Sequence, residues 1–206
     1  MARVGHPRWP KNPKYCAGCF AMLERNHGGA EIDCSLLFAD VRGSTTMAEG
    51  MSPREFNRIM GRFHDVAYDV LIEHDAFVDK FVGDEIIGIF VPALAAGEHA
   101  CRAVESAREL LRRTGHGGGQ PWVPVGIGIG TGTAYVGSLG EGPDTDLTAM
   151  GDLVNTTARL ASAAGGGEIL VTLPAAAAAD IEEGDERRAL ALKGKSRLTD
   201  VVVLRS

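Results

Sequence analysis

The order of the apolar segments predicts an α+β protein with a ferredoxin-like βαββαβ core, followed by additional C-terminal strands and helices. Two observations lead to this class. Apolar runs of strand length alternate with stretches at helical spacing, in the order strand, helix, strand, strand, helix, strand. The two middle strands are separated only by Gly83-Asp84, and a two-residue loop with glycine is a strong hairpin signal.

The core elements can be justified in order. The first strand is the apolar run 35–41. The first helix begins at Ser52, because Ser is a favoured N-cap, Pro53 suits the first helical position and Glu55 completes a capping box. The other core elements are the hairpin strands 77–82 and 86–91, a helix over 94–114 and a strand over 122–131.

Further elements follow this core. We expect a strand over 133–136, a helix over 152–163, a strand over 168–172, a helix over 175–181 and strands over 187–192 and 201–204. Residues 31–206 therefore form one folded domain. Residues 1–30 form an arm that is partly irregular, because three prolines oppose regular structure, with a short helix expected over 15–25.

Composition narrows the class of protein. The chain has 206 residues, enough for one substantial core, and its formal charge of −6 argues against a nucleic-acid-binding surface. No apolar stretch reaches the ~18 residues of a membrane span, and the N-terminus has no signal-peptide core, so we expect a cytoplasmic protein.

The four cysteines do not indicate a metal site. Cys16 and Cys19 have the CxxC spacing of metal ligands or a redox pair, but a second CxxC is missing. We therefore interpret them as two reduced thiols in the arm. Cys34 and Cys101 lie in apolar segments and are expected in the core.

Two aspartates are the first candidates for chemistry. Asp40 ends the first strand, and Asp84 lies at the tip of the hairpin, whose strand neighbours the first strand in this topology. Two carboxylates at adjacent strand ends can hold hard divalent cations, and Mg²⁺ commonly links one or two carboxylates to substrate phosphates. This arrangement indicates phosphoryl chemistry.

Other polar residues are weaker candidates when each is taken alone. The turn 43–45, Gly-Ser-Thr, could approach an anion, although it is also an ordinary connection to a helix. Alternation along the strand puts Lys80 on one face with residues 82 and 84, and Phe77, Phe81 and Asp79 on the other. Taken alone, Lys80 is better explained as a solvated lysine on a polar face. Asn155 and Arg159 share one helix face, and Lys193 could bind phosphate or lie in a basic surface turn.

Alternating glycines occupy the segment 126–132. They do not form a dinucleotide fingerprint, because no helix opens directly after them. Alternate glycines leave one strand face without side chains, which suits the close approach of a backbone or a ligand.

Together these segments resemble the class III nucleotidyl cyclase catalytic domain, the adenylyl and guanylyl cyclase family. The resemblance rests on five segments in family order between about residues 32 and 204: LFADVRGSTT at 37–46, DKFVGDE at 79–85, GTGTAYVG at 130–137, GDLVNTTAR at 151–159 and LKG at 192–194. Residues 1–30 lie outside it.

The resemblance implies a role for each matching residue. Asp40, Asp84 and the carbonyl of Val41 would bind two Mg²⁺ or Mn²⁺ ions per active site. Lys80 would read the purine edge, and residues 43–45 and Lys193 would contact the triphosphate. Asn155 and Arg159 would orient the ribose and stabilise the transition state. The family's sites form between the subunits of a head-to-tail dimer, so a homodimer is implied.

One departure bears on the substrate. Thr148 occupies the position of an aspartate that commonly helps the lysine to read the purine. A bicarbonate-responsive subgroup of adenylyl cyclases is similar in having Thr or Ser at this position. With Lys80, this resembles adenine recognition and implies adenylyl cyclase activity, the conversion of ATP to 3′,5′-cyclic AMP and pyrophosphate. The alternatives are a cyclase for GTP or a pyrimidine nucleotide, or a catalytically silent nucleotide-binding or dimerising regulatory domain. Gly126 also replaces a family arginine that often meets the phosphates.

Overall fold

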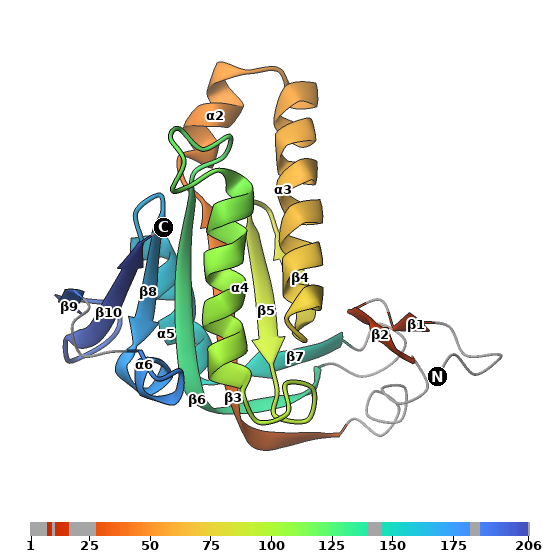
Figure 1. Cartoon of the computed structure of the whole chain (residues 1–206), viewed down its shortest axis with the longest axis vertical. Coiled ribbons are helices and arrows are strands. Elements are labelled where there is room, and N and C mark those ends of the chain that lie inside the picture. The colour runs from red at the N-terminus through yellow and green to blue at the C-terminus, as the bar shows by residue number, and fades with distance from the viewer. Residues whose placement is uncertain (1–7, 10, 17–27, 140–145, 182–185, 206) are drawn as a thin grey trace.

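The structure, a computed structural model, describes residues 8–9, 11–16, 28–139, 146–181 and 186–205 (Figure 1). The main sheet has eight strands in the order β4-β5-β3-β6-β8-β10-β9, with β7 paired to β6. Its strands are β3 (Gly29–Val41), β4 (Phe77–Val82), β5 (Glu85–Phe90), β6 (Val125–Leu139), β7 (Asp146–Met150), β8 (Glu168–Thr172), β9 (Glu186–Leu190) and β10 (Thr199–Arg205). The helices are α2 (Ser44–Gly50), α3 (Pro53–Glu73), α4 (His99–Thr114), α5 (Asp152–Ala163) and α6 (Leu173–Ala178).

The predicted ferredoxin-like core is confirmed. Its elements are β3, α3, β4, β5, α4 and β6, and the neighbours of β3 are β5 and β6, both antiparallel to it. The capping box is also confirmed, because the Ser52 hydroxyl accepts from the backbone N–H of Glu55 and the Glu55 carboxylate accepts from that of Ser52. Local sequence thus specifies where α3 begins.

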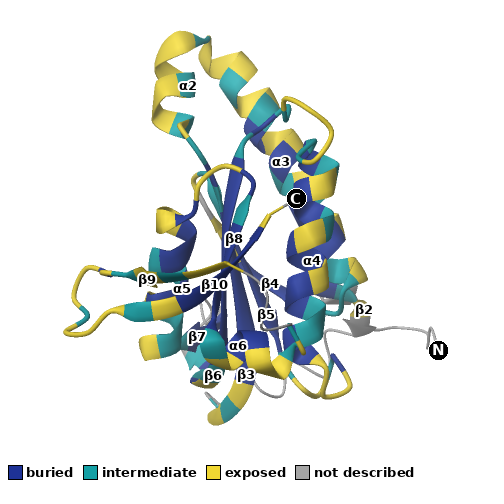
Figure 2. Ribbon diagram, turned by 60° about the vertical axis from the view of Figure 1, so that its left-hand side comes forward, coloured by how far each residue is buried: buried dark blue, intermediate teal, exposed yellow. Residues whose placement is uncertain are grey.

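Helices cover both faces of the sheet. Figure 2 shows α3 and α4 on one side of the strands and α5 on the other, with the buried residues concentrated between these layers. Alternate residues of β3 enter the two layers: Leu37 and Ala39 join the cluster under α3 and α4, whereas Leu36 and Phe38 join the cluster under α5. By this alternation Asp40 belongs to the α5 side of the sheet.

The alternating glycines of β6 allow close approach of a backbone, which is the backbone of α5. A Cβ on Gly128 would stand 2.5 Å from both the amide nitrogen of Ala161 and the carbonyl oxygen of Thr157. A Cβ on Gly126 would stand 2.7 Å from the carbonyl oxygen of Ala164. Hence α5 lies directly on the main chain of β6.

Several predicted boundaries were wrong. β3 begins at Gly29, six residues before the expected start, because its N-terminal half pairs with the far half of β6. The strands expected over 122–131 and 133–136 are one continuous strand, β6, and β7 was not predicted. α4 begins at His99 because residues 92–97 form turns, whereas α5 and β8 have the predicted bounds. α6 begins two residues earlier than expected, with Thr172 as its N-cap.

The arm contains regular structure that the sequence did not predict. Strands β1 (Arg8–Trp9) and β2 (Asn12–Cys16) form a small antiparallel sheet. Most of the helix expected over 15–25 lies outside the described residues, as does Cys19, and its first two residues belong to β2. The buried Asn12 side chain donates to the carbonyl of Ala76 at 2.7 Å, so β2 is attached to the domain just before β4.

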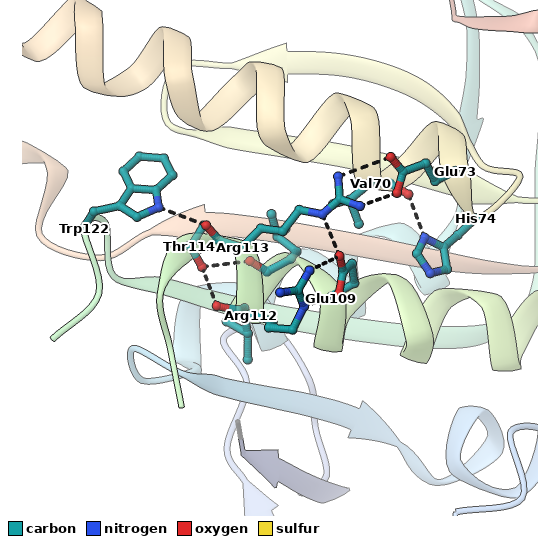
Figure 3. A network of polar contacts seen from close by, with 10 residues as sticks. Val70, Glu73, His74, Glu109, Arg112, Arg113, Thr114 and Trp122 are labelled. Carbon is teal, nitrogen blue, oxygen red and sulfur yellow. Dashed lines mark hydrogen bonds and ion pairs between the residues drawn. The ribbon is translucent and has the colours of Figure 1, made fainter. Parts of the chain in front are cut away.

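An ionic network joins α3 to α4 (Figure 3). Arg113 on α4 contacts Glu73 at the end of α3 and Glu109 one turn earlier on its own helix, and Arg112 contacts Glu109 at 2.7 Å. These hydrogen bonds lower the pKa of Glu109 to about 2, chiefly through Arg112. The network ties together the two helices that cover one face of the sheet.

Of the two cysteines expected in the core, one is buried in the structure. Cys34 is fully buried, and this burial raises the pKa of its thiol to about 12, whereas Cys101 is only half-buried. None of the helices in the described ranges combines the length and apolar character needed to cross a bilayer.

Candidate active site

The ends of β3 and of the β4–β5 hairpin bring the two predicted aspartates together. Asp40 lies opposite Glu85 in the β3–β5 ladder, and the backbone N–H of Val41 donates to the carbonyl of Asp84 at 3.2 Å. Both aspartates are partly exposed. The pKa of Glu85 is raised by burial and by the neighbouring Asp84, consistent with a concentration of negative charge at this edge.

Arg42 balances part of this charge. Its guanidinium forms an ion pair with Asp40, and its Nη1 donates to the carbonyl of Ser162 at 2.9 Å, near the end of α5. Burial lowers the pKa of Arg42, while the charges of Asp84 and Glu85 oppose that shift. Arg42 was not predicted as a site residue.

The turn at 43–45 lies beside Asp84. Gly43 has a φ of +70°, which favours glycine, and Ser44 donates its hydroxyl hydrogen to the Asp84 carboxylate. Residues Ser44, Thr45, Gly83 and Asp84 line one end of a cleft of about 750 Å³ between α2 and α3. The turn and the hairpin tip therefore form one continuous surface.

The donor set at this edge fits a hard divalent cation. Asp40 and Asp84 would supply carboxylate oxygens and Val41 a carbonyl, all from strand ends held by the backbone pairing described above. Across the described residues, no group of three or more His, Cys, Asp or Glu side chains is arranged to hold a metal. Two carboxylates suit Mg²⁺, which is usually bound by one or two of them together with substrate phosphates.

A β-bulge changes the predicted faces of β4. Val78 pairs with Gly88 and Phe81 with Ile86, so Asp79 and Lys80 together oppose one residue of β5. An unbroken strand would place Phe77 and Phe81 on one face. Phe77 instead joins the cluster on the α5 side and Phe81 contacts the ring of His64 on α3, so the expected alternation fails at the bulge. Asp79 is buried, whereas Lys80 is exposed.

Thr148 meets the bulge from the neighbouring strand β7. Its hydroxyl donates to Oδ2 of Asp79 at 2.8 Å, and Nζ of Lys80 lies 3.9 Å from the same oxygen. Lys11 of the arm reaches Asp79 from the other side, with its Nζ 3.4 Å from Oδ1. The two predicted purine-reading residues are thus linked through Asp79, which was not predicted as a site residue.

Asn155 and Arg159 lie on α5. Asn155 is exposed and Arg159 half-buried, whereas Thr157 and Leu160 pack into the domain, as expected for residues off the core face. Nη2 of Arg159 is 3.3 Å from the point where a Cβ on Gly194 would stand, which brings the guanidinium to the turn that carries the exposed Lys193.

The predicted site residues thus fall into three groups. Asp40, Val41, Asp84 and residues 43–45 share the strand-end edge, Lys80 and Thr148 meet at Asp79, and Arg159 adjoins the turn of Lys193. Lys11 and Asp79 were missed because their contacts span 68 residues of sequence. Strand periodicity carries no signal for such a contact.

Comparison with known proteins identifies the family of the chain. The family model "Adenylate and Guanylate cyclase catalytic domain" matches residues 30–204. Adenylate cyclase 1 of Rhizobium meliloti is 34% identical over 148 residues, which are 67% of this chain and 22% of that protein. An adenylate cyclase of Anabaena cylindrica is 33% identical over 132 residues, 61% of this chain and 26% of that protein. The chain therefore matches about a quarter of the length of these curated relatives.

Solved structures show the same architecture. The guanylyl cyclase Cya2 has a TM-score of 0.74 and 31% identity, covering 85% of this chain and 93% of that one. The adenylyl cyclase CyaB from P. aeruginosa has a TM-score of 0.74 and 25% identity, covering 87% and 97%. With the family model matching more than half of its residues, the chain belongs to the adenylate and guanylate cyclase catalytic domain family.

Proposed function

We propose that this chain is an adenylyl cyclase that converts ATP to 3′,5′-cyclic AMP and pyrophosphate. The observation that carries the proposal is the strand-end edge, where Asp40 and Asp84 lie beside the turn 43–45 and a cleft of about 750 Å³. An edge with this donor set suits a metal-bound triphosphate. Membership of the cyclase family narrows the reaction to cyclisation.

In this reaction the ribose 3′-oxygen forms a bond to the α-phosphorus, and the bond from that phosphorus to the bridging oxygen of pyrophosphate breaks. The proton of the 3′-hydroxyl would pass to Asp40 or to a water. Asp40, Asp84 and the carbonyl of Val41 would hold two Mg²⁺ or Mn²⁺ ions. Such ions lower the pKa of a bound hydroxyl and stabilise the leaving oxygens. Asn155 would orient the ribose, and Arg159 would offset charge that develops on the α-phosphoryl group.

The triphosphate would lie along the turn 43–45 and meet Lys193. The side chain of Lys193 is exposed, and its neighbour Lys195 forms an ion pair with Asp152. Lys193 therefore offers an ammonium group for phosphate. On metal binding Asp40 would exchange its ion pair with Arg42 for the metal, while Arg42 would keep its hydrogen bond to the carbonyl of Ser162.

We further propose that the working unit is a head-to-tail homodimer. Arg159 is directed to the turn at Gly194, whereas Asp40 and Asp84 lie at the strand-end edge. One bound nucleotide must contact both the aspartates and Arg159. In the family that the chain resembles, each site combines the aspartates of one subunit with the residues of the other that match Lys80, Asn155 and Arg159. A two-fold arrangement of this kind yields two equal sites.

GTP is the second candidate substrate. The specific observation in its favour is that the structure of a guanylyl cyclase, Cya2, is 31% identical to this chain. Against it stands Lys80, because an ammonium group only donates hydrogen bonds, which suits N1 of adenine and not the protonated N1 of guanine. We therefore favour ATP.

One experiment tests the reaction and the substrate together. The purified chain is incubated with ATP, GTP, CTP or UTP and with Mg²⁺ or Mn²⁺, and the products are identified by mass spectrometry. We expect 3′,5′-cyclic AMP as the main product, in a metal-dependent reaction. If only GTP gives a cyclic product, GTP replaces ATP as the assigned substrate. The absence of any cyclic product would contradict the proposed activity.

A further inference from the structure

We infer that Asp79 is a specificity-determining positioning residue, which fixes the hydroxyl of Thr148 as a hydrogen-bond acceptor and so selects adenine over guanine. The inference rests on the proposed function, because it concerns how Thr148 would read a purine. It goes beyond that function by assigning a residue that does not itself touch the nucleotide, together with a lysine of the N-terminal arm that holds it.

The first step is the state of the Thr148 hydroxyl. A threonine hydroxyl has one hydrogen to donate and two lone pairs to accept with. In the structure it donates to Oδ2 of Asp79 at 2.8 Å, and an ionised carboxylate can only accept. The single hydroxyl hydrogen is therefore committed to Asp79, and only the lone pairs remain for a ligand.

The second step is what holds Asp79 in place. Its side chain is only 4% exposed, and a buried carboxylate needs compensating partners. Lys11 provides them, because its Nζ is 3.4 Å from Oδ1 and donates to the backbone carbonyls of Asp79 and Leu147 at 2.8 and 2.7 Å. Since Leu147 precedes Thr148, Lys11 joins β4 to β7 at the residues that flank this hydrogen bond.

The third step is the bulge in β4. It places Asp79 and Lys80 opposite a single residue of β5, so that Nζ of Lys80 lies 3.9 Å from the same Oδ2 that accepts from Thr148. Bulges commonly re-aim side chains next to active sites. Here the bulge lets one carboxylate orient both residues that would contact the purine.

The consequence for recognition follows from the edges of the two purines. Adenine presents a 6-amino donor, whereas guanine presents the O6 acceptor at the same place. A hydroxyl that has only lone pairs to offer pairs with the amino group and leaves O6 without a donor. The free rotation of Thr148, which the sequence alone would allow, is thus removed by Asp79.

The test compares kcat/KM for ATP and GTP in the full chain and in the variants Asp79→Asn, Thr148→Val and the double variant. An asparagine keeps the shape of Asp79, but its amide group can donate to Thr148, which frees the hydroxyl hydrogen for guanine O6. We expect Asp79→Asn to lower the ATP-to-GTP ratio about tenfold. In the Thr148→Val background the same change should have no further effect. Asp200→Asn, an exposed residue on β10, is the matched control.

A merely structural role would lower activity with both nucleotides and leave the ratio unchanged, and that result would overturn the inference. If Asp79→Asn does not fold by circular dichroism, Lys11→Met replaces it. This variant removes the cation at Oδ1 of Asp79 and the link between β4 and β7, and it should also lower the ratio, again only when Thr148 is present. An unchanged ratio in Lys11→Met would likewise overturn the inference.

Failure of the proposed function gives a different result. A wild-type chain that prefers GTP would overturn both the substrate assignment and the inference. If no nucleotide is cyclised, the ratio of the dissociation constants for ATP and GTP is measured in the same four proteins. A rise of the dissociation constant for ATP relative to that for GTP in Asp79→Asn would support the inference even though the proposed activity had failed, and an unchanged ratio would overturn it.

Discussion

Ser44 donates its hydroxyl hydrogen to the carboxylate of Asp84, 40 residues further along the chain. This bond connects the turn after β3 to the tip of the β4–β5 hairpin, and the backbone bond from Val41 to Asp84 does the same at 3.2 Å. The orientation of Asp84 is therefore set by the element that carries Asp40. Ligands held in this way keep their relative geometry before a metal arrives.

Removing a strand-end carboxylate should abolish turnover without unfolding the domain. We expect Asp40→Ala and Asp84→Ala each to lower kcat/KM for ATP by at least about 10²–10³-fold. Ser44→Ala should cost about tenfold, because it removes the hydroxyl that orients Asp84 and leaves the backbone of the turn in place. The control is Asp33→Ala, an exposed residue on the same strand as Asp40. Normal activity in either purified aspartate variant would remove the metal-site assignment.

The proposed dimer predicts complementation between inactive variants. Asp40→Ala lacks a metal carboxylate and Arg159→Ala lacks the transition-state cation, so each should be inactive alone. A heterodimer would contain one site with both defects and one with neither, and the mixture should recover up to about a quarter of the wild-type rate if half of the dimers are mixed. Subunit exchange is checked by native mass spectrometry, and exchange without recovery would contradict the shared site.

Reversing the charge at position 80 should weaken the preference for ATP. Lys80 can donate to N1 of adenine, whereas a glutamate can accept from the protonated N1 of guanine. Lys80→Glu should therefore lower the ratio of kcat/KM for ATP to that for GTP. Each reversed hydrogen bond should change the free-energy difference between the two nucleotides by roughly 1–3 kcal/mol. Arg187→Glu on β9 makes the same change in charge at an exposed position and should leave the ratio alone.

The network of Figure 3 predicts a loss of stability in acid. The pKa of Glu109 is lowered to about 2 in the folded chain by its hydrogen bonds with Arg112 and Arg113, whereas its ordinary value is 4.5. A lowered folded-state pKa contributes stability that is fully present above 4.5 and disappears as the pH falls toward 2. Urea unfolding of Glu109→Gln and wild type should differ at pH 7 and converge near pH 2. Glu105→Gln, one turn earlier, is the control.

A methyl group on β6 should displace α5. The Cβ of Gly128→Ala would stand 2.5 Å from backbone atoms of Thr157 and Ala161, which cannot yield as side chains do. Overpacking of this kind costs about 1–3 kcal/mol in the free energy of unfolding. Gly61→Ala on α3, where a Cβ meets nothing within 4 Å, should instead stabilise the chain by up to about 1 kcal/mol. Equal melting temperatures for the two variants would contradict this account of the glycines.

Sequence predicted those elements whose signals are local. The start of α3 depends on residues 52–55, and the β4–β5 hairpin depends on a two-residue loop, so both were predictable. β7 was missed because its five residues form a strand only by pairing with the second half of β6. It has too few apolar residues to show the alternation of apolar and polar residues that identifies a strand.

The same distinction applies to the site. Asp40 and Asp84 follow strands whose neighbourhood the topology dictates, so their proximity could be predicted. The bulge at Asp79 and the contact from Lys11 could not, because alternation assumes an unbroken ladder and the Lys11 to Leu147 bond spans 136 residues. A proline-rich arm also gives no indication that one of its lysines enters the domain.

The face of β6 that carries Gly126 and Gly128 limits how substitutions can change this domain during evolution. Where a helix rests on side chains, their size can be altered to raise or lower it by fractions of an ångström. Here α5 rests on main chain at Gly126 and Gly128, so its distance from the sheet is already at the steric minimum. The height of Asn155 and Arg159 above the strands is thus closed to gradual adjustment, and variation in their reach must come from the loops at either end of the helix.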